Sequence, residues 1–326
     1  MQHSLAILDD YQSVALKIAD WSAISDTAKV PITVFSDHLS DETEVIARLK
    51  PFTIICIMRE RTKFTPALFA GLPNLKLLVT TGMRNLGIDL EAARAHGVVV
   101  SGTGSGGEST VETIWALILG VARNIVADHT RLTTPETATV WQAGRLPTGL
   151  YGRTLGVVGL GRLGSRVAAI AKVFGMNVLA WSENMTAEKA EAAGAKFAGS
   201  KEELMRQSDF VSVHVLLSER TVDLIGEAEL RLMKKTAFLI NTSRGPIVNE
   251  AALIKVLKED AIAGAALDVY NVEPLPVNHE LRKLGDKVLM LPHMAYVCDT
   301  AYEVFYRETV EDVLAYLSGS PIRVMT

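Results

Sequence analysis

Cysteine is scarce in this chain, and its scarcity excludes several classes of protein. Only Cys56 and Cys298 occur among the 326 residues. Two thiols are too few for a disulfide-stapled secreted scaffold, and they lack the paired spacing of a cysteine-based zinc site. We therefore expect two reduced thiols and no bound metal.

Long apolar runs and a large excess of one charge are also missing. The most apolar stretches, such as Ile54–Met58, are far shorter than the roughly 20 residues of a membrane-spanning helix. Residues 1–5 show no basic region leading into an apolar run, so no signal peptide is expected. The net charge of -4 gives no general attraction to nucleic acid or an anionic membrane. The expectation is a cytoplasmic protein with neither partner.

What the chain does contain is short apolar strands alternating with amphipathic helices, the pattern of a parallel α/β sheet. One series fills about the first hundred residues, a common domain size. The run Gly102–Gly107 follows and suits a hinge. A capping-box pattern at Ser109–Glu112 predicts a long helix to about Ala127. A second series starts at Thr154, and an amphipathic helix at Ala301–Leu317 ends the pattern.

A glycine motif, Gly159–Gly164, lies between a predicted strand and a predicted helix. In a dinucleotide-binding turn Gly159 permits the tight bend, Gly161 lets the backbone approach a pyrophosphate, and Gly164 lets helix and strand pack closely. The helix start offers N–H groups to the phosphates, and here these belong to Arg162 and Leu163. The alternative is a tight strand–helix turn without a ligand, but the context favours a nicotinamide dinucleotide.

The residue that should bind the adenosine ribose is less clear. A carboxylate is expected about 20 residues after the glycine motif, where this chain has Ser182 followed by Glu183. Glu183 would repel a 2′-phosphate if it points inward and not if it faces solvent. NAD is therefore the expected cofactor, with NADP left open.

Three motifs that each follow a predicted strand supply the candidate catalytic residues Arg244, Glu273 and His293. Ligands bind at the carboxyl ends of parallel strands. An arginine can hold a carboxylate bidentately, a histidine can donate a proton, and a glutamate bonded to the imidazole favours its protonated form. Taken singly, they could be a surface arginine, a turn glutamate and a structural histidine. Together they form the chemical set that reduces a 2-oxo acid.

With these motifs in this order, the chain resembles the D-isomer-specific 2-hydroxyacid dehydrogenase family, most strongly from Gly152 to Tyr296. The resemblance implies catalytic roles for Arg244, Glu273 and His293. It also implies two doubly wound parallel-sheet α/β domains, a flavodoxin-like substrate domain and a Rossmann dinucleotide-binding domain inserted in it. The expected boundaries are 1–102 with 298–326 for the substrate domain and 103–297 for the NAD-binding domain.

Further positions carry over from the resemblance. It implies a cofactor-binding role for a set of polar residues: Thr110, His214, Thr221, Thr242, Ser243 and Asp268. It implies that backbone N–H groups of Thr81 and Gly82 hold the substrate carboxylate. Two further candidates are suggested by their positions in the sequence. Tyr296 could narrow the substrate pocket, and Arg59 could face the substrate or simply pair with Glu60 at the surface.

The resulting expectation is an NAD(P)-dependent oxidoreductase that transfers a hydride between the cofactor and a 2-oxo or 2-hydroxy acid of D configuration. One alternative is an NAD(H)-sensing protein with little turnover, like corepressor relatives of the family. Another is a Rossmann methyltransferase, which would not need the Arg-Glu-His set. The long helix that begins at Ser109 resembles the family's dimer element, so a homodimer is expected. Glyoxylate, hydroxypyruvate, bulkier 2-oxo acids and even a non-carboxylate substrate all stay open.

Overall fold

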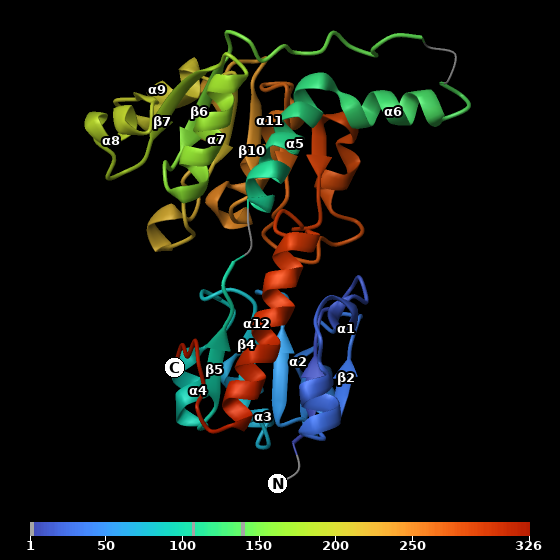
Figure 1. The fold of residues 1–326 in the computed structure, drawn as a ribbon. Helices are drawn as coiled ribbons and strands as arrows, with labels where there is room; N and C mark the ends of the chain where they lie inside the picture. The colour runs from blue at the N-terminus through green and yellow to red at the C-terminus, as the bar shows by residue number, and fades with distance from the viewer. Residues whose placement is uncertain (1–2, 106–107, 138–140) are drawn as a thin grey trace. The chain divides into compact units, whose positions relative to one another are not determined.

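The computed structural model describes residues 3–105, 108–137 and 141–326. The chain divides into two compact units (Figure 1). Unit 1 is Met1–Gly107 with Val297–Thr326, and unit 2 is Glu108–Tyr296. These bounds lie close to the expected 1–102 with 298–326 and 103–297. The last two glycines of the predicted hinge, Gly106 and Gly107, lie outside the described residues.

The core of unit 1 is a five-stranded parallel sheet in the order β2-β1-β3-β4-β5. The strands are β1 Leu5–Ile7, β2 Ile32–Val34, β3 Ile54–Ile57, β4 Leu77–Thr80 and β5 Val99–Gly102. Every residue of β3 and β4 is buried, as expected of parallel strands covered on both faces. This strand order is that of a flavodoxin-like fold, which confirms the expected class.

Three helices of unit 1 begin where the sequence supplies a side-chain cap. Asp41 accepts a hydrogen bond from Glu44 N, Thr65 from Leu68 N and Asp89 from Ala92 N. The helices of unit 1 are α1 Ala15–Ile18, α2 Glu42–Leu49, α3 Pro66–Gly71, α4 Leu90–Ala95 and α12 Asp299–Leu317, with a π-helical turn at Ala23–Thr27. The long α12 lies along the sheet of unit 1 and contacts β4 (Figure 1). The return of this last helix to the first unit agrees with the sequence expectation.

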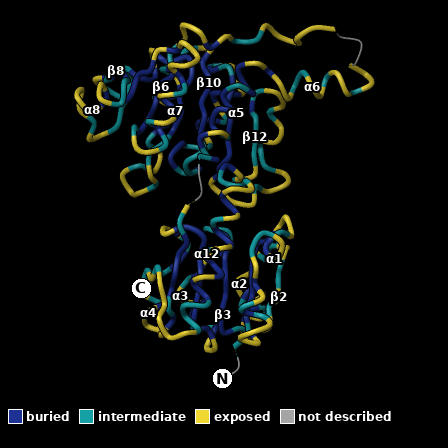
Figure 2. Tube along the Cα trace, in the orientation of Figure 1, coloured by how far each residue is buried: buried dark blue, intermediate teal, exposed yellow. Residues whose placement is uncertain are grey.

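Unit 2 contains a seven-stranded parallel sheet in the order β12-β11-β10-β9-β6-β7-β8, which extends the Rossmann strand order by one strand. The strands are β6 Thr154–Val158, β7 Asn177–Trp181, β8 Lys196–Phe197, β9 Phe210–Val213, β10 Phe238–Asn241, β11 Gly264–Leu267 and β12 Val288–Met290. Figure 2 shows that the central strands are buried and that exposed residues gather in the helices and loops around them. The expected Rossmann fold is confirmed.

The helices of unit 2 pack around its sheet, apart from α6, which projects away from it and has no buried residue (Figure 1). They are α5 Ser109–Arg123, α6 Ile125–Thr133, α7 Arg162–Val173, α8 Ala187–Ala192, α9 Lys201–Gln207, α10 Glu227–Leu232 and α11 Glu250–Lys258. Short 3-10 turns lie at Glu219–Thr221, Gly245–Ile247, Glu280–Lys283 and Gly285–Lys287. The first turn of α9 is capped by Ser200, whose side chain accepts from Glu203 N.

Two details of the predicted helix at Ser109–Ala127 are wrong. The helix breaks at Asn124, whose φ of 57° is left-handed, and α6 continues at an angle of 62° to α5. The capping box does not form, because Glu108 occupies the N-cap position without a side-chain cap. The hydroxyl of Ser109 instead donates to the carbonyl of Tyr296 at 3.4 Å. Among the described residues, no single helix has the length and apolar character to cross a membrane, and only the bent pair α5–α6 passes that test jointly.

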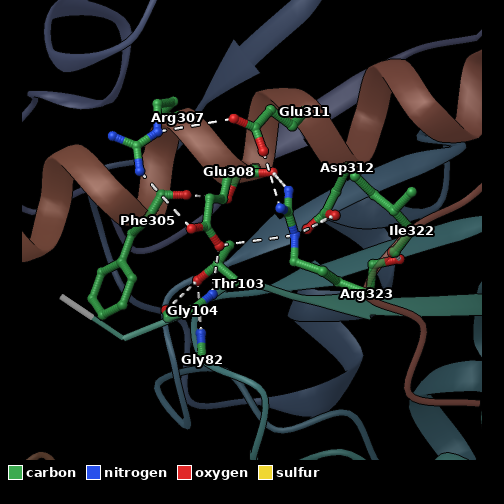
Figure 3. A network of polar contacts seen from close by, with 12 residues as sticks. Gly82, Thr103, Gly104, Phe305, Arg307, Glu308, Glu311, Asp312, Ile322 and Arg323 are labelled. Carbon is green, nitrogen blue, oxygen red and sulfur yellow. Dashed lines mark hydrogen bonds and ion pairs between the residues drawn. The ribbon is translucent and has the colours of Figure 1, made fainter.

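A buried carboxyl group on α12 makes the stability of unit 1 depend on pH. Asp312 is fully buried, and its Oδ1 accepts from Arg323 Nε at 2.9 Å (Figure 3). Burial raises the pKa of Asp312 to about 7, against the lowering effect of Arg323. The neighbouring Glu308 and Glu311 raise it further. Burial, and then the charge of Asp312, raise the pKa of the Cys56 thiol of β3.

We predict that Asp312→Asn gains stability relative to the parent as the pH rises. The pKa of Asp312 is higher in the folded protein than in the unfolded chain, so its contribution is greatest below the unfolded value near 4 and is lost as the pH rises through about 7. Asparagine does not titrate and keeps an oxygen for Arg323. Urea unfolding at about pH 5 and about pH 8 measures the difference. The control is Glu303→Gln, which alters an exposed residue of the same helix. Parallel pH profiles for parent and Asp312→Asn would contradict the prediction.

Candidate active site

The glycine motif of unit 2 forms the turn from β6 into α7. Gly159 has a φ of +97°, and its N–H donates to the carbonyl of Trp181 at 2.8 Å. A Cβ at Gly159 would lie 2.8 Å from Val215, and one at Gly164 would lie 2.1 Å from the Gly159 carbonyl oxygen. Both positions therefore require glycine for reasons internal to the protein.

Gly161 requires a different explanation. A Cβ there would meet no described atom within 4 Å, so the space over this backbone is open. Gly161 is also the N-cap of α7, which has no side-chain cap and no acidic residue in its first turn. An uncapped helix N-terminus presents N–H groups and partial positive charge. This open approach would admit a phosphate group to the first-turn backbone N–H groups of Arg162 and Leu163.

The residues expected near the adenosine lie on the neighbouring strand ends. Ser182 directly follows β7 and is half-buried, whereas Glu183 is exposed. The exposed side chain of Glu183 therefore gives no structural reason to exclude a 2′-phosphate. The hydroxyl of Thr221 accepts from Ser218 N and donates to the carbonyl of Leu216, both at 2.7 Å, so it closes its own loop.

His214 follows β9 beside the glycine turn, and its backbone N–H donates to the carbonyl of Val158 at 2.8 Å. Burial lowers the pKa of His214 to about 4, so the ring is neutral at physiological pH. Its Nε2 is buried and has no hydrogen-bond partner among the described residues. A buried nitrogen without a partner costs free energy, which fits a site that a polar ligand completes.

The loop that carries Arg244 is built by the side chain of Asn241, the last residue of β10. Its Oδ1 accepts from Ser243 N at 3.1 Å, and its Nδ2 donates to the carbonyl of Arg244 at 3.0 Å. The Ser243 hydroxyl donates to the carbonyl of Val215 at 2.5 Å. The half-buried Arg244 and its neighbour Thr242 are thus held at the carboxyl end of the strand. The sequence analysis missed this role of Asn241.

Gly245 brings this loop against the one that follows β11. A Cβ at Gly245 would lie 2.1 Å from the carbonyl carbon of Tyr270. The two backbones therefore touch with no room for a side chain. Tyr270 is itself buried, and its hydroxyl donates to the carbonyl of Leu291 at 2.8 Å. Three successive strand-end loops are tied together at this point.

The structure brings Glu273 and His293 together. Glu273 Oε2 lies 2.5 Å from His293 Nδ1, and Glu273 Oε1 accepts from Tyr270 N at 2.9 Å. The side chains are 27% and 14% exposed, so the pair is only partly shielded from solvent. An imidazole held by a carboxylate at one nitrogen is oriented for proton transfer at the other.

Asp268 fixes the backbone beside His293. It is fully buried, and its two oxygens accept from Met294 N at 2.7 Å and from Ala295 N at 2.9 Å. His293 has a φ of 52°, a left-handed conformation that non-glycine residues rarely adopt. The resemblance indicated only a cofactor contact for Asp268, whereas the structure shows that it holds this turn. An acidic residue directly after an apolar predicted strand was the sequence signal that could have revealed the role.

Helix α5 supports the same segment. Thr113 donates to the carbonyl of Ala295 at 3.3 Å, and Thr110 is half-buried one turn earlier. The ring of Tyr296 lies edge-on to His293, with 6.1 Å between ring centroids. Tyr296 thus lies next to the candidate proton donor.

In unit 1 the candidate substrate residues form one loop system. Arg59 N donates to the Thr81 hydroxyl at 3.0 Å, and Asn85 Nδ2 donates to the carbonyl of Arg59 at 2.7 Å. Arg59 has a φ of 51°, so it is a second candidate in a left-handed conformation. A Cβ on Gly82 would lie 2.3 Å from Arg59 Nη1, which shows that the guanidinium packs on this glycine. Arg59 also has the surface pairing considered above, 3.8 Å to Glu60.

The two amides expected to hold a carboxylate are engaged within the protein. Thr81 N donates to the carbonyl of Ile57 at 3.2 Å, and Gly82 N donates to the Thr103 hydroxyl at 2.9 Å. In this structure they hold the loop in place. A role for the loop in substrate binding would then rest on Arg59 and on the amides that follow Gly82.

No group of three or more His, Cys, Asp or Glu side chains that could hold a metal occurs in the described ranges. The chemistry available is that of an arginine, a carboxylate–imidazole pair and an open helix N-terminus. Arg244, Glu273 and His293 follow β10, β11 and β12, which are adjacent and parallel, so their carboxyl ends share one edge.

Comparisons with known proteins agree with this chemistry. Residues 115–295 match the model of the D-isomer specific 2-hydroxyacid dehydrogenase, NAD binding domain. A glyoxylate reductase of Aeropyrum pernix is 40% identical over 265 residues, covering 77% of this chain and 76% of the relative. A D-3-phosphoglycerate dehydrogenase of Methanocaldococcus jannaschii is 34% identical over 278 residues, 85% of this chain and 52% of that longer protein.

A solved structure is similar over nearly the whole chain. The phosphoglycerate oxidoreductase from Vibrio cholerae O395 has a TM-score of 0.90 and 36% identity, covering 98% of this chain and 100% of that one. The similarity thus includes both units.

Proposed function

Because the chain belongs to the D-isomer specific 2-hydroxyacid dehydrogenase family, we propose that it reduces a small 2-oxo acid with His293, Glu273 and Arg244 as its catalytic residues. The class of reaction follows from the family: an oxidoreductase that transfers a hydride between NAD and a 2-oxo or 2-hydroxy acid. The observation that carries the residue roles is the contact between Glu273 and His293. A sensor without turnover is not favoured.

The side chains support a division of labour. When bound, NAD(H) supplies or accepts the hydride at its nicotinamide ring. His293 Nδ1 is held by Glu273, so the proton exchanged with the substrate oxygen is carried at Nε2. The carboxylate of Glu273 favours the charged imidazolium that donates this proton. Arg244 binds the substrate carboxylate and its carbonyl oxygen through its planar guanidinium.

We propose the remaining cofactor contacts from the positions and burial of the residues beside the glycine turn. The α7 N-terminus at Gly161 would hold the pyrophosphate, and Ser182 and Glu183 would lie at the adenosine ribose. His214 Nε2 would gain a polar partner there. Neither lysine nor arginine lies at 182–184 to receive a 2′-phosphate, which supports a preference for NAD over NADP.

The substrate class follows from Arg59 and from the relatives. Glyoxylate reductases are among the relatives that are most similar in sequence, so glyoxylate or hydroxypyruvate is the proposed substrate. Arg59 would bind an anionic group, the carboxylate of these acids. Relatives named for phosphoglycerate make a phosphorylated 2-oxo acid the competing candidate.

A panel of 2-oxo acids tests the activity. We expect loss of NADH absorbance with glyoxylate or hydroxypyruvate and a lower kcat/KM with NADPH. Exchange of the catalytic histidine, His293→Gln, should lower kcat by about 10²- to 10⁴-fold, the usual contribution of a general acid. Faster turnover of 3-phosphohydroxypyruvate would replace the proposed substrate, and NADH binding without consumption of any acid would overturn the activity.

The pH profile tests the role of Glu273. Reduction requires protonated His293, and Glu273→Gln removes the negative charge 2.5 Å from its ring. The alkaline limit of kcat/KM for 2-oxo acid reduction should move to lower pH, because the protonated ring loses its negatively charged neighbour. Glu280→Gln, which removes an exposed carboxylate of the same unit, serves as control. An unchanged profile in Glu273→Gln would rule out this role.

A homodimer is proposed from helix α6. None of its residues is buried, and Ile125, Val126 and Leu132 are 54%, 52% and 49% exposed. A helix with exposed apolar residues and no buried face is typical of a surface that a second copy covers. Light scattering should give the mass of two chains for the parent and a shift toward one chain for Val126→Glu. A parent of single-chain mass would exclude the dimer. A cytoplasmic location without nucleic-acid or membrane partners stays a prediction.

A further inference from the structure

Thr103, which follows β5, connects the end of that strand to the candidate substrate loop of unit 1 by hydrogen bonds. Its hydroxyl accepts from Gly82 N at 2.9 Å and donates to the carbonyl of Gly104 at 2.9 Å. Its backbone N–H donates to the carbonyl of Thr80 at 3.0 Å. Thr103 is fully buried, so these bonds do not compete with bulk water. One side chain therefore fixes the backbone at the point where the loop leaves β4.

Glu308 of α12 holds the next residue. Its Oε2 accepts from Gly104 N at 2.6 Å, and a Cβ on Gly104 would lie 3.2 Å from the same oxygen. Figure 3 shows Glu308 pointing from α12 toward Gly104, with Thr103 and Gly82 beyond it. A short bond from an N–H to a carboxylate is stronger than one between neutral groups.

Arg323 stabilises this carboxylate and belongs to the same network. Its guanidinium lies 3.8 Å from Glu308 Oε2 and donates to the Glu308 carbonyl, to Glu311 and to Asp312. Its own carbonyl accepts from Gly102 N at 3.0 Å. The chain around Arg323 thus ties α12 to the end of β5, and Glu308 and Thr103 extend this connection to Gly82.

Gly82 lies between this network and Arg59. Its amide donates to Thr103, while a Cβ on the same residue would lie 2.3 Å from Arg59 Nη1. Its φ of +87° requires a backbone that most residues avoid. If the bond to Thr103 is lost, the buried Gly82 N–H needs another partner, and the backbone must shift to reach one. Such a shift moves the surface on which the Arg59 guanidinium packs.

We propose that Thr103 and Glu308 are positioning residues for the reaction, because they hold the Gly82 backbone where Arg59 and the following loop can receive the substrate anion. Neither contacts the substrate or the cofactor in this assignment. The proposal rests on the substrate role proposed above for the loop, and it adds two residues that lie outside the set of Arg244, Glu273 and His293. Because they act on binding geometry, their loss should affect KM for the 2-oxo acid more than kcat.

Valine and serine at position 103 separate the hydroxyl from the packing. Thr103→Val keeps the shape and removes the acceptor, so KM for the 2-oxo acid should rise by about tenfold, with kcat within about twofold of the parent. Thr103→Ser keeps the hydroxyl and should restore KM to within about twofold. Amide hydrogen exchange at Gly82 should be faster in Thr103→Val and near the parent rate in Thr103→Ser, a readout that does not depend on activity.

Variants of Glu308 give an independent comparison. Glu308→Ala should raise KM in the same way. Glu308→Gln keeps an oxygen for Gly104 N, so its KM should stay near that of the parent. Glu303→Ala makes the same truncation at an exposed position of α12 and should leave KM unchanged. If Thr103→Val does not fold, the Glu308 series decides the question.

The results of these experiments distinguish a failure of the positioning role from a failure of the proposed function. A parent that reduces a 2-oxo acid, with Thr103→Val and Glu308→Ala variants that keep its KM, would overturn the positioning role and leave the function intact. Faster exchange at Gly82 without a change in KM would also overturn it, since the bond would then be structural only. A parent that consumes no NADH with any acid would defeat the proposed function, and the positioning role with it.

Discussion

Parallel pairing of β10, β11 and β12 is the constraint on which the candidate site depends. Each strand delivers one motif, and because the strands run the same way, their ends meet at one edge of the sheet. Arg244, Glu273 and His293 are thereby gathered although tens of residues separate them in the chain. Backbone contacts then set the fine geometry: Asn241 shapes the first loop, Gly245 presses it on the second, and Asp268 holds the third. The candidate catalytic side chains thus depend on backbone contacts made by neighbouring residues.

Much of this arrangement could be predicted because it is local or periodic in the sequence. Buried parallel strands read as apolar runs, and the glycine turn reads as a motif between a strand and a helix. The pairing of Glu273 with His293 was expected from the order of motifs and the resemblance together. Contacts between distant backbones were not predictable in this way. Nothing near Ser109 signals that its hydroxyl bonds to Tyr296 and not to its own helix, and nothing near Asn124 signals a bend of 62°.

The candidate substrate loop of unit 1 also depends on contacts that the sequence does not predict. The resemblance placed Thr81 and Gly82 at the substrate, but it could not show that their amides already donate to Ile57 and Thr103. Those bonds join residues about 20 positions apart or more, and they appear only when the fold is known. Through these bonds the two amides hold the loop in shape.

The backbone contact at Gly245 has a consequence for how such a site can evolve. With 2.1 Å available for a Cβ, every other amino acid would force the Arg244 loop away from the Tyr270 loop. Position 245 is therefore closed to variation, whereas the exposed surface around Arg84 and Leu86 tolerates many side chains. Under the proposed function, a lineage that acquires a new substrate would change the loop of unit 1 and inherit the Gly245 junction unaltered. Laboratory libraries that aim at new specificity would follow the same division.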